Sequence, residues 1–372
     1  MRDESIGDAD ESVHSYANPE SSSMRARLRI IVVGVGERGS EWVDSILGLG
    51  DDFELVGVVD NLPERREQQI VKKIRAYDTI DKLVEREGRV DGAVLALPPR
   101  LYAAVRRDCI RHGIAILQEK PVAASLGELV QLQTDLLNRP VPLLVAVQRR
   151  YHASYRHLKG ILEKCRHEDI ETLTVSIRLG RNPSDEPSGH RNDSQLVRGG
   201  AFIDLGYHAI DLVQFLINRP VELVSASMWS ELHPTRVISW EDPSPMLGNG
   251  LDLAIRQEFE SSADILARCD GVFVRVRIDR FGEKGEEVVV TTRTESYCAT
   301  RSSCGQSGQR PSFECDGNWA EAVRNLLYEF HSVVVGERMP ADLRDSLADM
   351  RVIESAYAAA MEIPVGGKWG VV

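Results

Sequence analysis

Unbroken hydrophobic runs alternate with helical patterns in the first half of the chain. Each run has the length and the β-branched content of a strand buried on both faces. These runs are residues 28–33, 53–59, 92–97, 114–118 and 143–147. Apolar residues at helical spacing lie between them, at residues 63–75, 80–87, 101–112 and 125–137. Such alternation is typical of a doubly wound parallel sheet, so we predict a Rossmann-type α/β domain over residues 28–147.

From Gln148 the pattern changes to one of half-buried strands without crossover helices. After a helix at residues 155–164, residues 172–179 alternate between apolar and polar side chains. Residues 272–280 alternate in the same way, and a Gly-Glu-Lys-Gly turn leads into residues 287–290, which predicts an antiparallel hairpin. We therefore expect an α+β domain over residues 148–372 with a largely antiparallel, open-faced sheet.

The ends of the chain are predicted to differ in order. Residues 1–27 are rich in Ser, Asp and Glu, and we interpret them as a disordered leader, with Met24 as an alternative start of translation. Residues 318–334 and 341–361 have helical spacing and are interpreted as packing elements. Because the open face of an antiparallel sheet often becomes an interface, we expect a homodimer or homotetramer.

Composition narrows the class of protein. The net charge of -12 argues against a nucleic-acid partner, which requires a basic face. The sequence has neither an apolar run long enough to span a bilayer nor a signal-peptide pattern, so we expect a cytoplasmic protein without a membrane partner. The six cysteines include no Cys-x-x-Cys pair, and we interpret the Ser/Gly-rich stretch holding Cys298, Cys304 and Cys315 as a loop rather than a metal site.

A glycine-rich turn follows the first predicted strand. Gly34, Gly36 and Gly39 form a Gly-x-Gly-x-x-Gly pattern that opens a helix. In a dinucleotide-binding unit these glycines permit the tight turn, the approach of a pyrophosphate and the close packing of helix on strand. The sequence therefore predicts a nicotinamide dinucleotide cofactor.

Asp60 ends the second predicted strand, about twenty residues after the last glycine, where a carboxylate would accept hydrogen bonds from ribose hydroxyls. A carboxylate there repels a 2′-phosphate and favours NAD. Arg65 and Arg66 follow closely, and they would offer a phosphate clamp for NADP if the carboxylate turned away. We expect NAD, with NADP as the alternative.

A second informative stretch covers residues 199–217, a predicted helix opened by two glycines. Asp204, His208 and Asp211 share one face of an otherwise apolar helix. A structural Asp–His pair is the plain alternative to a catalytic one. Hydride transfer to or from a carbinol needs a group that handles the hydroxyl proton, and histidine beside a carboxylate suits that chemistry. Lys120, between Glu119 and Pro121 at a strand end, would place a positive charge beside a developing alkoxide.

Several spaced motifs together resemble one family. The glycine-rich start, Glu119-Lys120-Pro121, Arg149-Arg150-Tyr151, and Gly199-Gly200 followed by Asp204-x-Gly206-x-His208-x-x-Asp211 resemble the Gfo/Idh/MocA oxidoreductases, which include inositol, glucose and related sugar dehydrogenases. The resemblance extends to residues 342–349. It differs from the family at Tyr102, where a histidine is common, and in the long charged stretch 181–198.

The resemblance implies an NAD(P)-dependent oxidoreductase acting on a secondary alcohol or ketone of a sugar, cyclitol or related polyol. It implies a catalytic trio of Lys120, Asp204 and His208, with histidine rather than the neighbouring Tyr207 as the proton carrier. We expect the cofactor to contact Gly34, Gly36, Glu37, Arg38, Gly39, Asp60, Pro98, Glu119 and Lys120. Two other functions remain open: a non-catalytic NAD(P)-binding sensor or scaffold, and an NAD-dependent hydrolase or lyase that oxidises its substrate transiently.

Overall fold

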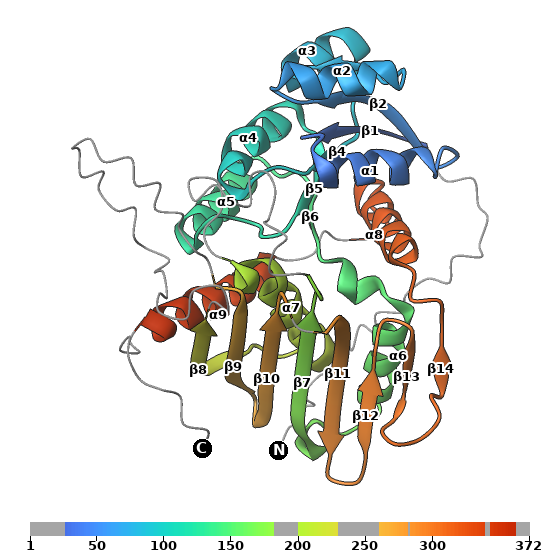
Figure 1. Ribbon diagram of the computed structural model, residues 1–372. Helices are drawn as coiled ribbons and strands as arrows, with labels where there is room; N and C mark the ends of the chain where they lie inside the picture. The colour runs from blue at the N-terminus through green and yellow to red at the C-terminus, as the bar shows by residue number, and fades with distance from the viewer. Residues whose placement is uncertain (1–26, 182–199, 230–259, 282, 339–342, 362–372) are drawn as a thin grey trace, which may run out of the picture.

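The structure is a computed structural model that describes residues 27–181, 200–229, 260–281, 283–338 and 343–361 (Figure 1). The leader with Met24, Gly199, most of the charged stretch 181–198 and the predicted helix start at residue 341 lie outside the described residues. Within the described chain, no helix is both long and apolar enough to cross a membrane.

The first sheet is six-stranded and parallel, with the strand order β3-β2-β1-β4-β5-β6. Its strands are β1 (Leu28–Val33), β2 (Phe53–Val59), β3 (Ala76–Tyr77), β4 (Gly92–Leu95), β5 (Ala115–Glu119) and β6 (Leu143–Ala146). The helices between them are α1 (Glu37–Leu47), α2 (Pro63–Val71), α3 (Ile80–Glu87), α4 (Tyr102–His112) and α5 (Leu126–Asn138). The predicted Rossmann-type sheet is confirmed. One face packs with α1 in one hydrophobic cluster, and the other face belongs to a larger cluster that continues into the core of the second sheet.

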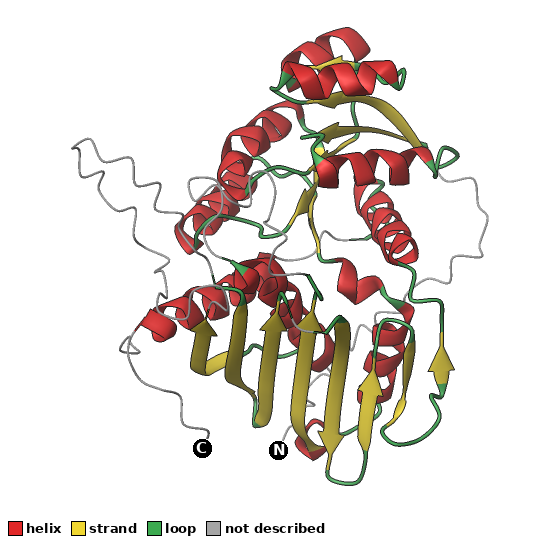
Figure 2. Cartoon of the chain, viewed as in Figure 1, coloured by secondary structure: helices red, strands yellow, loops and turns green. Residues whose placement is uncertain are grey.

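The second sheet has eight strands in the order β14-β13-β12-β11-β7-β10-β9-β8. They are β7 (Ile170–Arg178), β8 (Glu222–Trp229), β9 (Ser262–Cys269), β10 (Val272–Asp279), β11 (Gly285–Thr292), β12 (Ser296–Ala299), β13 (Ser303–Gln306) and β14 (Phe313–Glu314). Neighbouring strands are antiparallel except β7 and β10 (Figure 2). The predicted α+β fold with a largely antiparallel sheet is confirmed.

The predicted hairpin between residues 272–280 and 287–290 is wrong. Strand β7 lies between β10 and β11, parallel to the first and antiparallel to the second. The true hairpin joins β9 to β10 through Asp270 and Gly271, whose φ angles are 47° and 91°. Positive φ at both central residues is the signature of a type I′ turn, and Asp-Gly is its usual sequence. The Asp-Gly pair is the local sequence signal for the hairpin between β9 and β10. The position of β7 between β10 and β11 depends on contacts between residues distant in sequence.

The Ser/Gly-rich stretch interpreted as a loop is also different in the structure. It contains strands β12, β13 and β14, which extend the sheet at one edge. Ala299 and Cys304 pair across β12 and β13 and are buried. Tyr297 and Phe313 of the same strands pack half-buried against the core. Because the strands are short, composition alone did not reveal them.

The remaining helices join the two sheets. Helices α6 (Ala153–Leu162), α7 (Tyr207–Ile217) and α9 (Leu343–Met361) gather with the second sheet. Helix α8 (Trp319–Val334) returns instead to the first sheet beside α1 (Figure 1). Its Phe330 packs against β1 and β4, where Gly92 leaves room for the ring. Helix α8 thus brings its first residues to the edge of the glycine turn.

Candidate active site

The glycine turn between β1 and α1 has the shape of a phosphate cradle. Gly34 has φ of 85°, and a Cβ there would lie 2.5 Å from the carbonyl oxygen of Ala96. A Cβ on Gly39 would lie 1.8 Å from the carbonyl oxygen of Gly34. At Gly36 a Cβ would meet only the guanidinium of Arg65, at 3.6 Å. No side chain of the described residues caps α1, so its first N–H groups can bind a phosphate. These features fit a dinucleotide.

Asp60 orders this turn. Its carboxylate accepts hydrogen bonds from the N–H groups of Val35 and Leu62, both at 2.9 Å, and the side chain is 2% exposed. Arg65 lies 3.5 Å from the same carboxylate, and Arg66 donates to the backbone carbonyl of Asp60 at 2.7 Å. The carboxylate is therefore turned toward the glycine turn, and Arg65 lies beside it at the protein surface.

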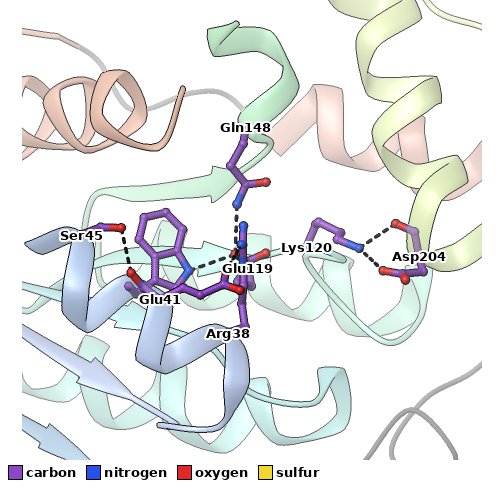
Figure 3. Close-up of polar contacts among 8 residues, drawn as sticks. Arg38, Glu41, Ser45, Glu119, Lys120, Gln148 and Asp204 are labelled. Atoms are coloured by element: carbon purple, nitrogen blue, oxygen red, sulfur yellow. Dashed lines mark hydrogen bonds and ion pairs between the residues drawn. The ribbon is translucent and has the colours of Figure 1, made fainter. Parts of the chain in front are cut away.

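Glu119, at the end of β5, collects three donors on one oxygen. Its Oε1 accepts from Arg38 Nε at 2.7 Å, from Trp42 Nε1 at 2.9 Å and from Gln148 Nε2 at 3.0 Å (Figure 3). The carboxylate thus ties α1 and the 3-10 turn Gln148–Tyr151 to the strand that carries Lys120. The Oε1 atom of Gln148 is buried without a hydrogen-bond partner among the described residues.

Arg38 serves the same junction. Besides Glu119 it pairs with Glu41, and its guanidinium lies 5.7 Å from the ring centre of Trp42 and 5.8 Å from that of Trp319. The guanidinium therefore faces other side chains in this structure. Trp319 is the first residue of α8. Its contact with Arg38 was not predicted, because helical spacing identified that helix only as a packing element.

Lys120 and Asp204 meet across the two halves of the molecule. The Lys120 ammonium donates to the Asp204 carboxylate and to its backbone carbonyl, each at 2.6 Å (Figure 3). The two side chains are 12% and 30% exposed, so the pair is partly accessible to solvent rather than enclosed in the core. Asp204 belongs to a π-helical turn, Phe202–Gly206, that precedes α7. The structure thus brings together two of the three predicted catalytic residues.

His208, one turn further on, is buried and close to cations. Burial lowers the pKa of its imidazole well below the ordinary value, and the nearby charges of Arg149, Lys120 and Arg38 lower it further. Its Nδ1 has no hydrogen-bond partner among the described residues. The imidazole is therefore held in its neutral form, in which one ring nitrogen can accept a hydrogen bond. Tyr207 faces elsewhere: burial and then the Asp349 carboxyl raise the pKa of its hydroxyl well above the usual value.

Asp211 does not share the surroundings of Asp204. Its carboxylate receives two contacts from Arg150, at 2.6 and 2.8 Å, and Arg150 also reaches Asp345 at 3.0 Å. The expected polar stripe is thus divided between two environments. The π-helical turn explains this, because its i→i+5 pattern changes the direction of Asp204 relative to α-helical spacing.

Arg149 completes the cationic surroundings of His208. It forms a bidentate pair with Glu286 on β11, at 2.9 and 3.0 Å, and Tyr155 donates to the same carboxylate at 2.8 Å. Burial alone would raise the pKa of Glu286, but the Arg149 charge and these hydrogen bonds lower it below its ordinary value. Glu286 was not predicted, because nothing local distinguishes it from Glu287.

For two further positions expected to contact the cofactor, Pro98 and Glu37, the structure gives only their place in the fold. Pro98 lies in the loop after β4, at the start of the 3-10 turn Pro99–Leu101, and Glu37 occupies the first turn of α1. In the described part of the chain, His, Cys, Asp and Glu side chains form no cluster that could hold a metal ion.

The sequence and the fold were compared with those of known proteins. The profile of the Gfo/Idh/MocA oxidoreductase family, NAD-binding Rossmann fold, matches residues 28–147, and that of the family's C-terminal domain matches residues 155–299. Among curated proteins, the rhizopine catabolism protein MocA of Rhizobium meliloti is 27% identical over 51% of this chain, and an inositol 2-dehydrogenase of Rhizobium meliloti (strain 1021) is 24% identical over 54%. The matches span 57% and 58% of those two proteins' own lengths.

The solved structure of GenD2 from gentamicin A biosynthesis, in complex with NAD, superposes with a TM-score of 0.73 at 18% identity and covers 93% of this chain and 98% of its own. At that identity the superposition shows a shared fold. Taken with the two family profiles, which follow one another along the chain, it leads to one conclusion. The chain belongs to the Gfo/Idh/MocA family of oxidoreductases.

Proposed function

We propose that this protein is an NAD(P)-dependent oxidoreductase that transfers a hydride between nicotinamide and a secondary alcohol or ketone of a sugar, cyclitol or related polyol. The observation that carries the proposal is the contact of Lys120 with Asp204, next to a neutral, buried His208 and at the end of the strand beside the glycine turn. Family membership and the names of the relatives, an inositol dehydrogenase among them, support this chemistry.

The cofactor would be held by the glycine turn and the residues around it. The N–H groups at the start of α1 would bind the pyrophosphate, Asp60 would face the adenosine ribose, and Glu119 and Lys120 would lie near the nicotinamide ribose. When bound, the nicotinamide supplies or accepts the hydride. Asp60 favours NAD, because a carboxylate repels a 2′-phosphate, and the relative GenD2 was solved with NAD.

The protein's own residues would manage the proton and the charge. In the oxidative direction His208 accepts the hydroxyl proton of the substrate, since its imidazole is neutral. Lys120 stabilises the negative charge that develops on the substrate oxygen. Asp204 orients the Lys120 ammonium and accepts a hydrogen bond from a substrate hydroxyl. In the reductive direction the same groups act in reverse.

The first test is titration calorimetry with NAD, NADH, NADP and NADPH on the wild type and on Asp60→Ala. We expect micromolar binding of NAD or NADH, and a shift away from NAD in the variant. Absence of binding by all four to folded protein that retains no cofactor would contradict the proposal and favour a scaffold. Cofactor that stays bound through gel filtration without net NADH release would instead favour a hydrolase or lyase.

The second test is a screen of polyols and keto-sugars with absorbance of NADH as the signal. We expect Lys120→Ala and His208→Ala each to lower kcat by about 10²- to 10⁴-fold, the usual contribution of acid–base and electrostatic catalysis. Lys82→Ala is the matched control, because Lys82 is an exposed lysine that pairs only with Asp78 in the described structure. Full activity of the Lys120 and His208 variants would contradict the assignment.

A further inference from the structure

The first backbone N–H groups of the segment that carries Asp204 are bound by two residues from distant parts of the chain. The Glu260 carboxylate accepts from Gly200 N at 3.0 Å and from Phe202 N at 2.9 Å. The backbone carbonyl of Glu260 accepts from Ala201 N at 2.9 Å. Three consecutive N–H groups at the start of a helix are thereby satisfied by one residue.

Tyr357 of α9 completes this arrangement. Its hydroxyl donates to Glu260 Oε1 at 2.5 Å and accepts from Ile203 N at 3.2 Å, so the fourth N–H group is bound as well. Glu260 and Tyr357 are 8% and 3% exposed. A buried carboxylate is costly unless hydrogen bonds compensate it, and here each of its oxygens is used.

The next residue after these four is Asp204. Its position is fixed from the other side by Lys120, which contacts both its carbonyl and its carboxylate at 2.6 Å. The turn that contains Asp204, Phe202–Gly206, is π-helical, a conformation less stable than the α-helix and common at functional sites. Such a turn persists only where its surroundings hold it. Glu260 and Tyr357 are the groups that hold its beginning.

We propose that Glu260 and Tyr357 are positioning residues of the active site: they fix the turn Phe202–Gly206 and so keep the Asp204 carboxylate against the Lys120 ammonium. Their role in catalysis rests on the oxidoreductase function proposed above. Their effect on the Lys120–Asp204 contact does not, since that contact involves only side-chain and backbone groups of this chain.

The test measures the rate at which Lys120 is acylated by a small amine-reactive reagent, resolved by peptide mass spectrometry. An ammonium that donates to a carboxylate is protected, so Asp204→Asn gives the rate of released Lys120. We expect Glu260→Gln to raise the wild-type rate by about tenfold, the equilibrium factor for one charge-assisted hydrogen bond. The side-chain amide of the glutamine has one oxygen acceptor, and its NH₂ group would face a backbone N–H group of Gly200 or Phe202 that then has no acceptor. Tyr357→Phe, which removes one donor and one acceptor, should raise it by a smaller factor.

Glu354→Gln is the matched control. Glu354 also belongs to α9, and its carboxylate accepts from Leu126 N at 2.8 Å at the start of α5, away from Asp204. This variant should leave the acylation rate of Lys120 unchanged. Thermal unfolding of each variant checks folding, and Tyr357→Phe serves if Glu260→Gln does not fold. Unchanged Lys120 acylation in both positioning variants, with a raised rate in Asp204→Asn, would overturn the proposal; an unchanged rate in Asp204→Asn itself would do the same.

Turnover separates this proposal from the proposed function. With a substrate from the screen, Glu260→Gln and Tyr357→Phe should lower kcat by about 10- to 100-fold while the calorimetric affinity for NADH stays at the wild-type value, because small displacements of a catalytic group cost about that much. If the protein binds no dinucleotide, the proposed function fails, but the acylation result still decides whether these residues position Asp204.

Discussion

At the scale of single residues, the site consists of buried and half-buried charges, each held by a partner. Arg38 is paired with Glu119, Lys120 with Asp204, and Arg149 with Glu286. Burial, and then the charges of these three cations, lower the pKa of the His208 imidazole well below its ordinary value. Removing one partner of a buried pair costs more than the pair contributes, because the remaining charge is left without compensation. Titratable residues near this cluster should therefore make the free energy of unfolding depend on pH.

His152, which precedes α6, should limit stability in acid. Burial lowers the pKa of its imidazole from 6.5 to about 4, so the unfolded chain binds a proton that the folded chain does not. Stability is then lost as pH falls from about 6.5 toward 4, by up to about 3 kcal/mol for this group. His152→Phe should keep the contact with Trp319, at 5.3 Å, and flatten the decline. Urea unfolding between pH 4 and 7 measures it; an unchanged slope would contradict the assignment.

Asp349 on α9 should act in the opposite direction. Burial, and then the charge of Asp211, raise its pKa well above the ordinary value, so the folded state retains a proton that the unfolded state releases. Stability from this group therefore decreases as pH rises above about 4. Asp349→Asn can still accept the hydrogen bond that Gln214 donates. We expect the stability of the variant relative to the wild type to increase as pH rises from 4 to 8. Parallel curves would contradict this.

At the scale of elements, the π-helical turn before α7 decides where Asp204 and His208 lie. Gly206 ends this turn, and the ring of Phe202 packs directly over it. A Cβ on Gly206 would lie 2.3 Å from that ring, closer than any real contact. The glycine thus serves the packing of the turn, a role that differs from the one proposed for the glycines between β1 and α1.

Gly206→Ala should therefore displace the turn. We expect a loss of about 1–3 kcal/mol in the free energy of unfolding, the usual cost of overpacking, and a fall in kcat without loss of NADH binding. Adding Phe202→Leu makes room for the new methyl group and should restore part of the kcat. If the double variant is no more active than the single one, the contact with Phe202 is not the cause. Steady-state kinetics and calorimetry decide between these outcomes.

At the scale of the whole molecule, none of the described helices lies on one face of the second sheet (Figure 2). Along β10, Val274, Val276 and Ile278 are buried toward the helices, whereas Phe273 on the opposite face is 58% exposed. Leu266 on the neighbouring β9 is 44% exposed. Exposed apolar side chains on adjacent strands favour an interface, and we propose that a second copy of the chain covers them.

Phe273→Glu tests this proposal. Light scattering coupled to gel filtration should show a dimer or tetramer for the wild type and a smaller species for the variant, because an isologous interface receives the new charge twice. Leu137→Glu is the control, since Leu137 is 83% exposed on α5. A wild-type monomer, or equal masses for all three proteins, would contradict the proposal.

Local patterns accounted for much of this protein. The β-branched runs and the glycine turn identified the parallel sheet, because strands buried on both faces and a Gly-x-Gly-x-x-Gly turn are properties of neighbouring residues. Motif spacing likewise singled out Lys120, Asp204 and His208. The same local reasoning missed strands β12 to β14, whose fully buried hydrophobic residues are Ala299 and Cys304, and it paired β10 with β11.

The sequence by itself therefore determined the two kinds of sheet and the glycine turn, and it singled out the candidate catalytic residues, since short-range periodicity and residue type encode these. Tertiary structure alone decided which residues meet. Glu260 and Tyr357 reach the turn of Asp204, Glu286 reaches Arg149, and Trp319 reaches Arg38 from positions far apart in the chain. Such meetings depend on how the two sheets and the returning helix α8 pack together. Packing is a property of the whole chain, and no local pattern of hydrophobic and polar residues records it.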